Sequence, residues 1–269
     1  MIGASRESLT TVQESLRSSA GQGDLSALSS QLLSVAKVIA GEKSLRLMLA
    51  DSGQPVAART ALISDLLGAA ISEATQSVIA SVVSQRWSSD SDLIDALEIL
   101  GAKAAFMAAD ANGSLNQAES DIFHFGRALD ASAQLQMTLT DPSLAPQAKA
   151  AIVGDLLNGK VQSETAQVIA YFASNLRGRR VDAVVDLLSE LAAAQRNQVV
   201  AEVSSVIELD DSQVTRLANA LSKLTGKQVS INVAIDPTVL GGISIQIGQD
   251  VIDGSVATRL ESARRSLQA

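Results

Sequence analysis

The sequence predicts a mainly α-helical protein that ends in a small α+β domain with the element order β-α-β-β-α. Three observations lead to this prediction. Hydrophobic residues make up 46% of the chain but aromatic residues only 2%, so Ala, Leu, Val and Ile must build the core. Apolar residues recur with the helical period of about 3.6 as far as residue 198. From residue 199 they alternate with polar residues, as they do in strands.

The first helices have clear ends in the sequence. Residues 4–20 form a periodic segment that ends at Gly21. Asp24 is a good N-cap for the next helix, because its carboxylate can accept hydrogen bonds from free backbone N–H groups. The pattern continues through residues 45–49 and breaks at residues 51–55, DSGQP. Shorter helices are then expected around residues 57–67 and 73–87, and a longer one at residues 92–111.

The helical region contains an internal duplication. Residues 58–80, ARTALISDLLGAAISEATQSVIA, match residues 148–170, AKAAIVGDLLNGKVQSETAQVIA, at an offset of 148 − 58 = 90. Asp51 and Asp141, which stand at breaks between helices, match at the same offset, as a true repeat requires. Residues 92–111 then close the first copy and open the second. The added copy is either a second interaction surface or a longer spacer.

The repeat and the change of period divide the chain into three predicted domains. Residues 1–94 form an additional helical repeat, residues 95–198 a helical bundle, and residues 199–269 an α/β domain. Within the last domain, alternation predicts strands at residues 199–209, 229–235 and 243–247, which Val251 and Ile252 can extend past a turn. Asp210 or Asp211 caps the helix between the first two strands. A last helix carries Val256, Leu260, Ala263 and Leu267 on one face.

Charge and composition exclude several classes of function. The formal net charge of −8 repels a phosphate backbone, so nucleic acid is not expected as a partner. The absence of Cys and the presence of a single His leave few ways to build a metal site, and we expect neither a metal nor a cofactor. No uncharged stretch approaches the roughly 18 apolar residues of a membrane span. Any membrane association is therefore expected through a partner.

The paired glycines at 241 and 242 do not fit a catalytic or phosphate-binding motif. A phosphate loop leads directly into a helix, whereas Gly241 and Gly242 lead into a predicted strand. A nucleophile elbow needs a second glycine where Gln246 stands. We interpret them as structural, with Asp236 and Pro237 starting a turn and the glycines adopting conformations that a Cβ would forbid.

The stretch 231–267, INVAIDPTVLGGISIQIGQDVIDGSVATRLESARRSL, resembles the C-terminal signature of the delta subunit of F-type ATP synthases, the bacterial counterpart of the mitochondrial oligomycin-sensitivity-conferring protein. The residues that carry the signature are Asp236, Pro237, Leu240, Gly241, Gly242, Asp253, Gly254 and Ser255. Residues 173–191 and 102–135 are similar to upstream parts of the family. The first 90 or so residues are an addition that the family does not usually carry.

The resemblance implies a non-enzymatic role in the stator of the ATP synthase, without a cofactor. The helical bundle would bind N-terminal helices of the alpha subunits, and the C-terminal domain would bind the C-terminal ends of the b subunits in the peripheral stalk. The protein would hold the catalytic head still at the cytoplasmic face of the plasma membrane. The alternative is a stand-alone helical scaffold or adaptor protein, which would leave the C-terminal signature unexplained.

An Ala-rich bundle has shallow grooves that suit an amphipathic partner helix. The positions expected near a groove for an alpha N-terminus are Leu97, Leu100, Ala104, Phe106, Val184, Val185 and Leu188, each of which is otherwise ordinary core. Arg177, Arg179 and Arg180 form the one dense basic cluster. This cluster either pairs with acidic residues of a partner or is simply charge at a helix end.

Overall fold

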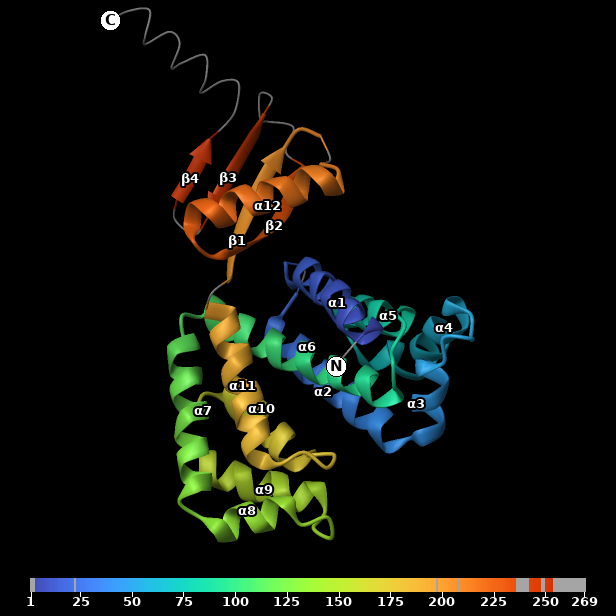
Figure 1. Cartoon of the computed structure of the whole chain (residues 1–269), viewed down its shortest axis with the longest axis vertical. Coiled ribbons are helices and arrows are strands. Elements are labelled where there is room, and N and C mark those ends of the chain that lie inside the picture. Colours follow the sequence, from blue (N-terminus) through green and yellow to red (C-terminus); the bar gives the residue numbers. More distant parts are fainter. Residues whose placement is uncertain are drawn as a thin grey trace, which may run out of the picture. The chain divides into compact units, whose positions relative to one another are not determined.

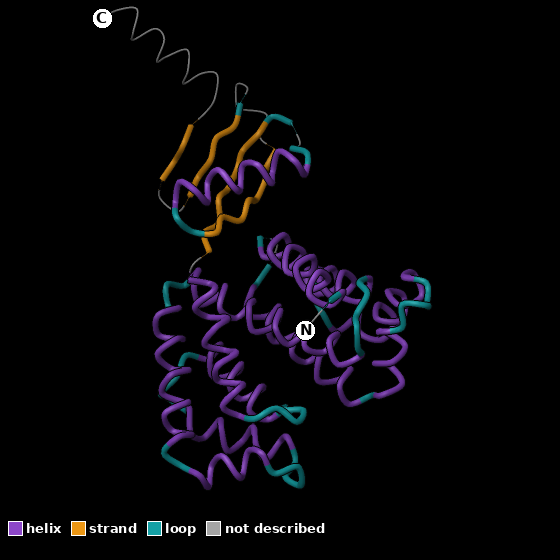
Figure 2. The backbone as a smooth tube through the Cα atoms, viewed as in Figure 1, coloured by secondary structure: helices purple, strands orange, loops and turns teal. Residues whose placement is uncertain are grey.

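The computed structural model describes residues 3–21, 23–196, 198–207, 209–235, 242–247 and 250–253. The chain forms two compact units, Met1–Gln195 and Arg196–Ala269. The first is built of helices and the second contains the sheet (Figures 1 and 2). The repeat predicted at residues 1–94 and nearly all of the bundle predicted at residues 95–198 fall in the first unit. Their division at residue 94 stays a prediction.

Six helices form the first bundle of the helical unit. They are α1 (Ala4–Ala20), α2 (Leu25–Gly41), α3 (Lys43–Ala50), α4 (Val56–Leu67), α5 (Glu73–Ser84) and α6 (Asp90–Ala111). Asp24 caps α2 as predicted, since its Oδ1 accepts from the backbone N–H groups of Ser26 at 2.8 Å and Ala27 at 3.2 Å. The apolar faces of these helices meet in one buried cluster around Leu32 and Ile79.

Five further helices complete a second bundle. They are α7 (Leu115–Asp130), α8 (Ala133–Thr140), α9 (Pro146–Leu157), α10 (Ser163–Ser174) and α11 (Val181–Arg196). Helices α8, α9 and α10 begin and end 90 residues after α3, α4 and α5 (133 − 43 = 90). Helix α11 begins 91 residues after α6 (181 − 90 = 91), because the loop before it is one residue longer.

The buried residues repeat with the helices. The pairs buried in both copies include Leu32 and Ile122, Val35 and Phe125, Ile39 and Leu129, Leu49 and Leu139, Ile63 and Val153, Val78 and Val168, and Ile79 and Ile169. A polar contact repeats too. The Gln31 Oε1 accepts from the Ser72 N–H at 3.0 Å, and 90 residues later an Asp121 oxygen accepts from the Gln162 N–H at 3.4 Å. The predicted duplication is confirmed.

Helix α6 belongs to both bundles, as the sequence predicts. It is the last helix of the first copy and the first helix of the second. Leu93, Leu97, Leu100 and Ala104 lie in the first buried cluster, whereas Ala102, Ala105, Phe106 and Ala109 lie in the second. The boundary predicted at residue 94 falls inside this helix because both copies use it.

Helices α2 and α6 approach each other closely through small residues. The Ser29 hydroxyl donates to the Gly101 carbonyl at 2.8 Å, and both residues are buried. A Cβ added at Gly101 would lie 2.7 Å from Cδ2 of Leu33. Leu33 is itself only 2% exposed and packs in the second cluster. Gly101 therefore sets the distance between two helices that join the two copies.

The C-terminal unit contains β1 (Gln198–Ser205), α12 (Asp211–Thr225), β2 (Gln228–Ile235), β3 (Ile243–Ile247) and β4 (Asp250–Asp253). The strand order is β2-β1-β3-β4. Strand β1 pairs parallel with β2 across the α12 connection and antiparallel with β3. Val251 and Ile252, expected to continue the third strand past a turn, lie in a separate strand, β4, which pairs antiparallel with β3.

Helix α12 is fixed at both ends and covers part of the sheet. Asp210 is its N-cap and forms a capping box with Gln213, while Gly226 ends it with a φ of 68°. Its buried Leu221 packs with sheet residues such as Val203 and Ile245. Nothing as large as the two helical cores is present among the described residues of this unit.

Two of the signature residues lie in the described part of the C-terminal unit. Gly242 has a φ of 84°, so the predicted glycine conformation is confirmed at this position. Asp253 pairs with Ser244 across β3 and β4. The other six, Asp236, Pro237, Leu240, Gly241, Gly254 and Ser255, lie outside the described residues, as does the predicted last helix.

Substituting Gly101→Ala is expected to lower the free energy of unfolding by up to about 2 kcal/mol. Overpacking against Leu33 costs about 1–3 kcal/mol, and the better helix propensity of Ala offsets about 1 kcal/mol of this. The matched control is Gly154→Ala in α9, where a Cβ meets nothing within 4 Å and the variant should gain stability. Urea unfolding followed by circular dichroism measures both. An equal gain in both variants would contradict the close packing of α2 on α6.

Candidate functional site

Six of the seven positions predicted near an alpha groove lie in the two cores. Their side chains, those of Leu97, Leu100, Ala104, Phe106, Val184 and Leu188, are at most 1% exposed. Val185 is half-buried beside α7, with its Cγ1 3.0 Å from the position of a Cβ on Gly126. The first three belong to the first core and the other three to the second, so the structure does not gather them at one surface. Their role in partner binding stays a prediction.

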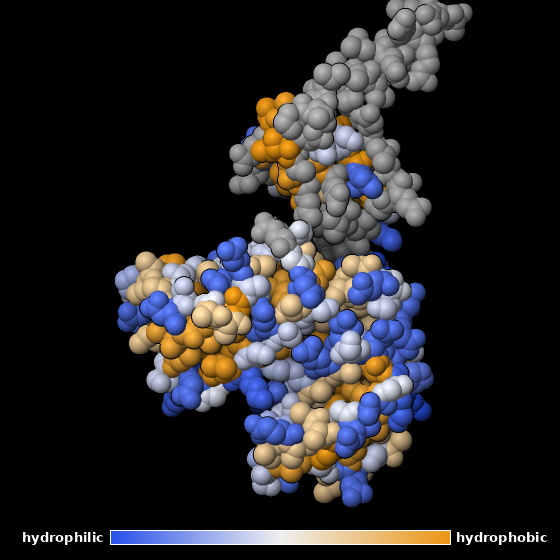
Figure 3. Space-filling view, turned by 180° about the vertical axis from the view of Figure 1, so that it is seen from behind, coloured by the Kyte–Doolittle hydropathy of each residue, from blue (hydrophilic) through white to orange (hydrophobic). Residues whose placement is uncertain are grey.

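The larger exposed apolar side chains of the helical unit lie elsewhere. They are Val38, Leu47, Met48, Val56 and Leu66 in the first copy and Phe123 and Met137 in the second. Figure 3 shows that apolar side chains gather in patches on the helical unit instead of spreading evenly. These positions could not be found from periodicity, because the apolar stripe of each helix is the face that the core buries.

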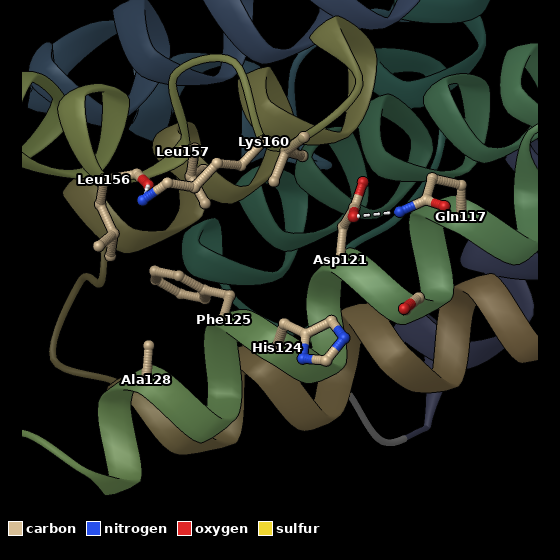
Figure 4. Close-up of a pocket in the computed structure, with 10 residues that line it drawn as sticks. Gln117, Asp121, His124, Phe125, Ala128, Leu156, Leu157 and Lys160 are labelled. Atoms are coloured by element: carbon tan, nitrogen blue, oxygen red, sulfur yellow. Dashed lines mark hydrogen bonds between the residues drawn. The ribbon is translucent and has the colours of Figure 1, made fainter.

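A groove of about 360 Å³ lies between α7 and α9 in the second copy. Phe125, Leu156 and Leu157 form its apolar wall, and Asp121 and His124 lie at its polar side (Figure 4). The groove thus offers an apolar wall and polar groups side by side, as the apolar and polar faces of an amphipathic partner helix require.

Asp121 in this groove is held by structural hydrogen bonds. It accepts from Gln117 Nε2 at 2.7 Å and from the Gln162 N–H at 3.4 Å. The second bond repeats the Gln31 to Ser72 contact of the first copy, so it belongs to the bundle's framework. No group of three or more His, Cys, Asp or Glu residues that could hold a metal ion occurs in the described part of the chain.

A buried ionic cluster joins the two copies beside α6. Glu98 of α6 is 0% exposed, and its carboxylate accepts from Arg177 Nε at 3.1 Å and Nη2 at 2.8 Å. Arg179 Nη2 lies 2.8 Å from the same carboxylate, and the Tyr171 hydroxyl donates to it at 3.3 Å. Asp95 adds a further ion pair to Arg177. We call Glu98, Asp95, Tyr171, Arg177 and Arg179 the junction.

Electrostatics at the junction favour the paired, charged state. Burial by itself lowers the pKa of the Arg177 guanidinium, but hydrogen bonds and ion pairs with Glu98 and Asp95 outweigh burial and raise this pKa. Burial, and then the negative charge of Glu98, raises the pKa of the Tyr171 hydroxyl, which stays protonated and can donate. The Arg177 guanidinium therefore keeps its charge, and the Tyr171 hydroxyl keeps its proton to donate, across the physiological pH range.

The loop that carries Arg177 is held in an unusual conformation. Arg177 has a φ of 50° and is followed by Gly178 with a φ of 83°. A left-handed conformation costs a non-glycine residue about 1–2 kcal/mol, which the ion pairs of Arg177 can offset. The basic cluster noted in the sequence is thus split. Arg177 and Arg179 bind acids of this chain, and Arg180 pairs with Asp182 at the surface.

The buried ion pairs of Glu98 were not predicted, although the sequence carries a signal for them. Glu98 follows Leu97 and precedes Leu100, within a helix that two bundles share and must bury on two sides. A carboxylate there needs a cationic partner, and the dense arginine cluster offers several cations close together.

Sequence comparisons relate the chain to one family. The family described as ATP synthase delta (OSCP) subunit matches residues 102–267. The ATP synthase subunit delta of Streptomyces griseus is 38% identical over 269 residues, with 99% of each chain covered. That of Nocardia farcinica is 39% identical over 272 residues, with 99% of this chain and 100% of the relative covered.

A solved structure, that of the Toxoplasma gondii mitochondrial ATP synthase hexamer, contains a chain that is 20% identical to this one with a TM-score of 0.28. The alignment covers 64% of this chain and 98% of that chain, and a likeness this weak carries no argument. The two bacterial relatives, by contrast, align over almost their whole length. The first 90 or so residues, expected to be an unusual addition, therefore have counterparts in the Streptomyces and Nocardia subunits.

Removing the junction carboxylate with Glu98→Ala is expected to lower the free energy of unfolding by about 3 kcal/mol. This is the lower end for a broken buried ion pair, because Arg177 and Arg179 keep 20% and 27% exposure. The control Asp182→Ala breaks the exposed pair with Arg180 and should change little. Chemical unfolding measures both. Equal effects of the two variants would show that the junction adds no stability.

Proposed function

Since this chain belongs to the family of ATP synthase delta (OSCP) subunits, we propose that it ties the catalytic head of the enzyme to its peripheral stalk. Subunits of this family are peripheral-stalk components of the F-type enzyme. The finer proposal has two parts. The helical unit binds N-terminal helices of the alpha subunits, and the C-terminal unit binds the C-terminal ends of the b subunits. The role is mechanical, and we propose no reaction and no cofactor.

The shared helix and the junction support a mechanical role for the helical unit. A stator must resist rotation of the head. If the two bundles moved freely relative to each other, the head could turn with the rotor. Here α6 runs through both copies, and Glu98 ties it to the loop after α10 by ion pairs. Coulomb attraction inside a protein is stronger than in water, so such pairs hold a fixed geometry well. The two copies therefore move as one body.

Apolar side chains at the surface of the helical unit support helix binding. A groove between two helices accepts the apolar face of an amphipathic partner helix. The α7–α9 groove and the exposed apolar residues of the first copy offer such surfaces. None of the seven positions predicted for alpha binding lines the α7–α9 groove, and their part in alpha binding stays a prediction.

The C-terminal unit presents an apolar surface at one edge of its sheet. Strand β2 is an edge strand, and its Val233 and Ile235 are 36% and 61% exposed. Val206 and Ile207 follow the end of β1, next to Ile235 in the sheet register, and are exposed as well. We assign the binding of the b subunits to this edge, called the β2 edge, formed by Val206, Ile207, Val233 and Ile235.

The proposed location is the cytoplasmic face of the plasma membrane, within the ATP synthase complex. Among the described residues, no helix is both long and apolar enough to cross a membrane. Attachment would therefore come from the other subunits of the complex.

The first test is to recover the full-length chain from native, detergent-solubilised membranes and to quantify the alpha and b subunits that accompany it. Both are expected in the recovered complex. Vesicles depleted of the chain should keep ATP hydrolysis but lose ATP-driven proton pumping until the chain is added back. Recovery of unrelated proteins, with pumping unaffected by depletion, would favour the scaffold alternative instead.

The β2 edge is tested with Ile235→Asp, which places a charge on the proposed b surface. Recovery of b should fall at least tenfold while recovery of alpha is unchanged. Leu224→Asp is the matched control, because Leu224 is 71% exposed on α12 of the same unit, away from the β2 edge. Loss of b in both variants, or in neither, would contradict the assignment of this edge.

A further inference from the structure

The second and last helices of each copy have an outer side, which the second copy covers in the first copy but which is exposed in the second copy. In the first copy these helices are α2 and α6, and Leu33 of α2 is 2% exposed because it packs in the core of the second copy. Its equivalent in the second copy, at 33 + 90 = 123, is Phe123 of α7, which is 62% exposed. A large aromatic side chain thus lies open where the repeat elsewhere buries an apolar one.

The last helices of the two copies differ in the same way. Asp95, Glu98 and Ala102 of α6 face the second copy, and the last two are 0% exposed. At the offset of 91 that holds for this helix, the equivalents on α11 are Asp186, Ser189 and Ala193. All three are exposed. Val185 beside Gly126 shows that α11 adjoins α7, so these residues and Phe123 share one outer face.

The negative charge on this face stands at a position whose equivalent in the first copy has a cationic partner. Asp95 pairs with Arg177, which the covering copy supplies from the loop after α10. Asp186 is the equivalent acid, and it forms no hydrogen bond or ion pair within the described ranges of the chain. Glu190 lies one turn further along α11 and is exposed as well. The face therefore offers an apolar ring and unpaired negative charge side by side.

The element that covers the equivalent face in the first copy is a helix. Glu164 of α10 accepts a hydrogen bond from Ser26 of α2 at 3.4 Å, and Tyr171 of α10 donates to Glu98 of α6 at 3.3 Å. Helix α10 thus lies along both α2 and α6, and Arg177 follows its end. The first copy shows which occupant such a face takes, namely an amphipathic helix with a nearby cation.

We propose that the outer face of α7 and α11, formed by Phe123, Asp186, Ser189 and Ala193, binds an amphipathic helix of another ATP synthase subunit. We call it the α7–α11 face. An apolar side chain of the partner helix covers Phe123, and a Lys or Arg of that helix pairs with Asp186. The proposal rests on the proposed function for the presence of the other subunits. It adds a docking surface distinct from the α7–α9 groove on the other side of α7 and from the β2 edge.

Because the chain contains no Cys, a single thiol introduced by Phe123→Cys allows a direct test. Maleimide labelling of this thiol is compared in the isolated full-length chain and in the assembled ATP synthase. Assembly should slow labelling at least tenfold, and a photo-crosslinker attached to the thiol should join it to a helix of another subunit. Met137→Cys is the control, since Met137 is 72% exposed on α8, outside the face, and labelling there should not slow.

Unchanged labelling of the Phe123→Cys variant on assembly would overturn the proposal. Equal slowing in both variants would do so too, because it would reflect general crowding. A crosslink to residues 196–269 of the same chain would mean that the chain covers its own face, and would also overturn it. If the chain joins the complex and supports proton pumping while the thiol at position 123 stays open, only the α7–α11 face is wrong. If the chain does not join the complex, the proposed function fails.

The ion pair is tested separately with Asp186→Lys. Competition with the unsubstituted chain for incorporation into the complex should show a loss of at least tenfold. Asp155→Lys makes the same charge change at an exposed position of α9, and its incorporation should be unaffected. Equal incorporation of the two variants would show that Asp186 has no cationic partner.

Discussion

The helical unit depends on one constraint, which is that α6 must be buried on two sides at once. An ordinary bundle helix has one apolar stripe and one wet face. Helix α6 closes one core with Leu93, Leu97 and Leu100 and opens another with Ala102 and Phe106. A helix with so little solvent-exposed surface cannot carry large residues on every side. It also cannot leave a charged side chain unpaired on a buried side. Gly101 meets the first requirement, and Glu98 has to meet the second through its arginines.

The junction shows how a costly group can give the fold specificity. Burying a carboxylate is unfavourable unless charge and hydrogen bonds compensate it. Glu98 has three partners, and they come from α10 and from the loop that follows it. Glu98 finds its compensation only where Arg177 and Arg179 reach it, so the ion pairs favour the one register of the second copy against α6 that brings them together. Specificity of this kind suits the mechanical role proposed for this subunit.

Much of the fold could be predicted from the sequence, because local sequence patterns determine where its helices begin and end. The helix starting at Ala4, the Asp24 cap and the break at residues 51–55 depend on residues close in the chain, and the repeat offset is found by matching two such local patterns. Each agrees with the structure. The separate β4 was not foreseen, since the short apolar run of Val251 and Ile252 is equally consistent with a continuation of the third strand past a turn. The offset of 91 at α11 was hidden for a similar reason: one extra loop residue shifts the register without changing the composition.

The candidate sites were harder to predict, for a physical reason. Periodicity identifies the inward face of a helix, so it selected Leu97 and Leu188, which are core. Residues that a partner can reach lie outside that stripe, as Phe123 does, and a single apolar residue among polar ones carries no periodic signal. Glu98 needed knowledge of which helices adjoin α6. Only the repeat, read on the structure, turns Phe123 and Asp186 from surface residues into counterparts of a known interface.

The sharing of α6 also sets how such a protein could grow. Each further copy would need five new helices instead of six, since the last helix of one copy is the first of the next. Successive residues of a helix are turned by about 100° around its axis. The angle between neighbouring copies is therefore encoded in which residues of the shared helix face each core. If the apolar residues that face the second core were shifted by one position along α6, the second bundle would pack at a different angle around this helix. The register of the shared helix therefore determines the shape of an array of copies.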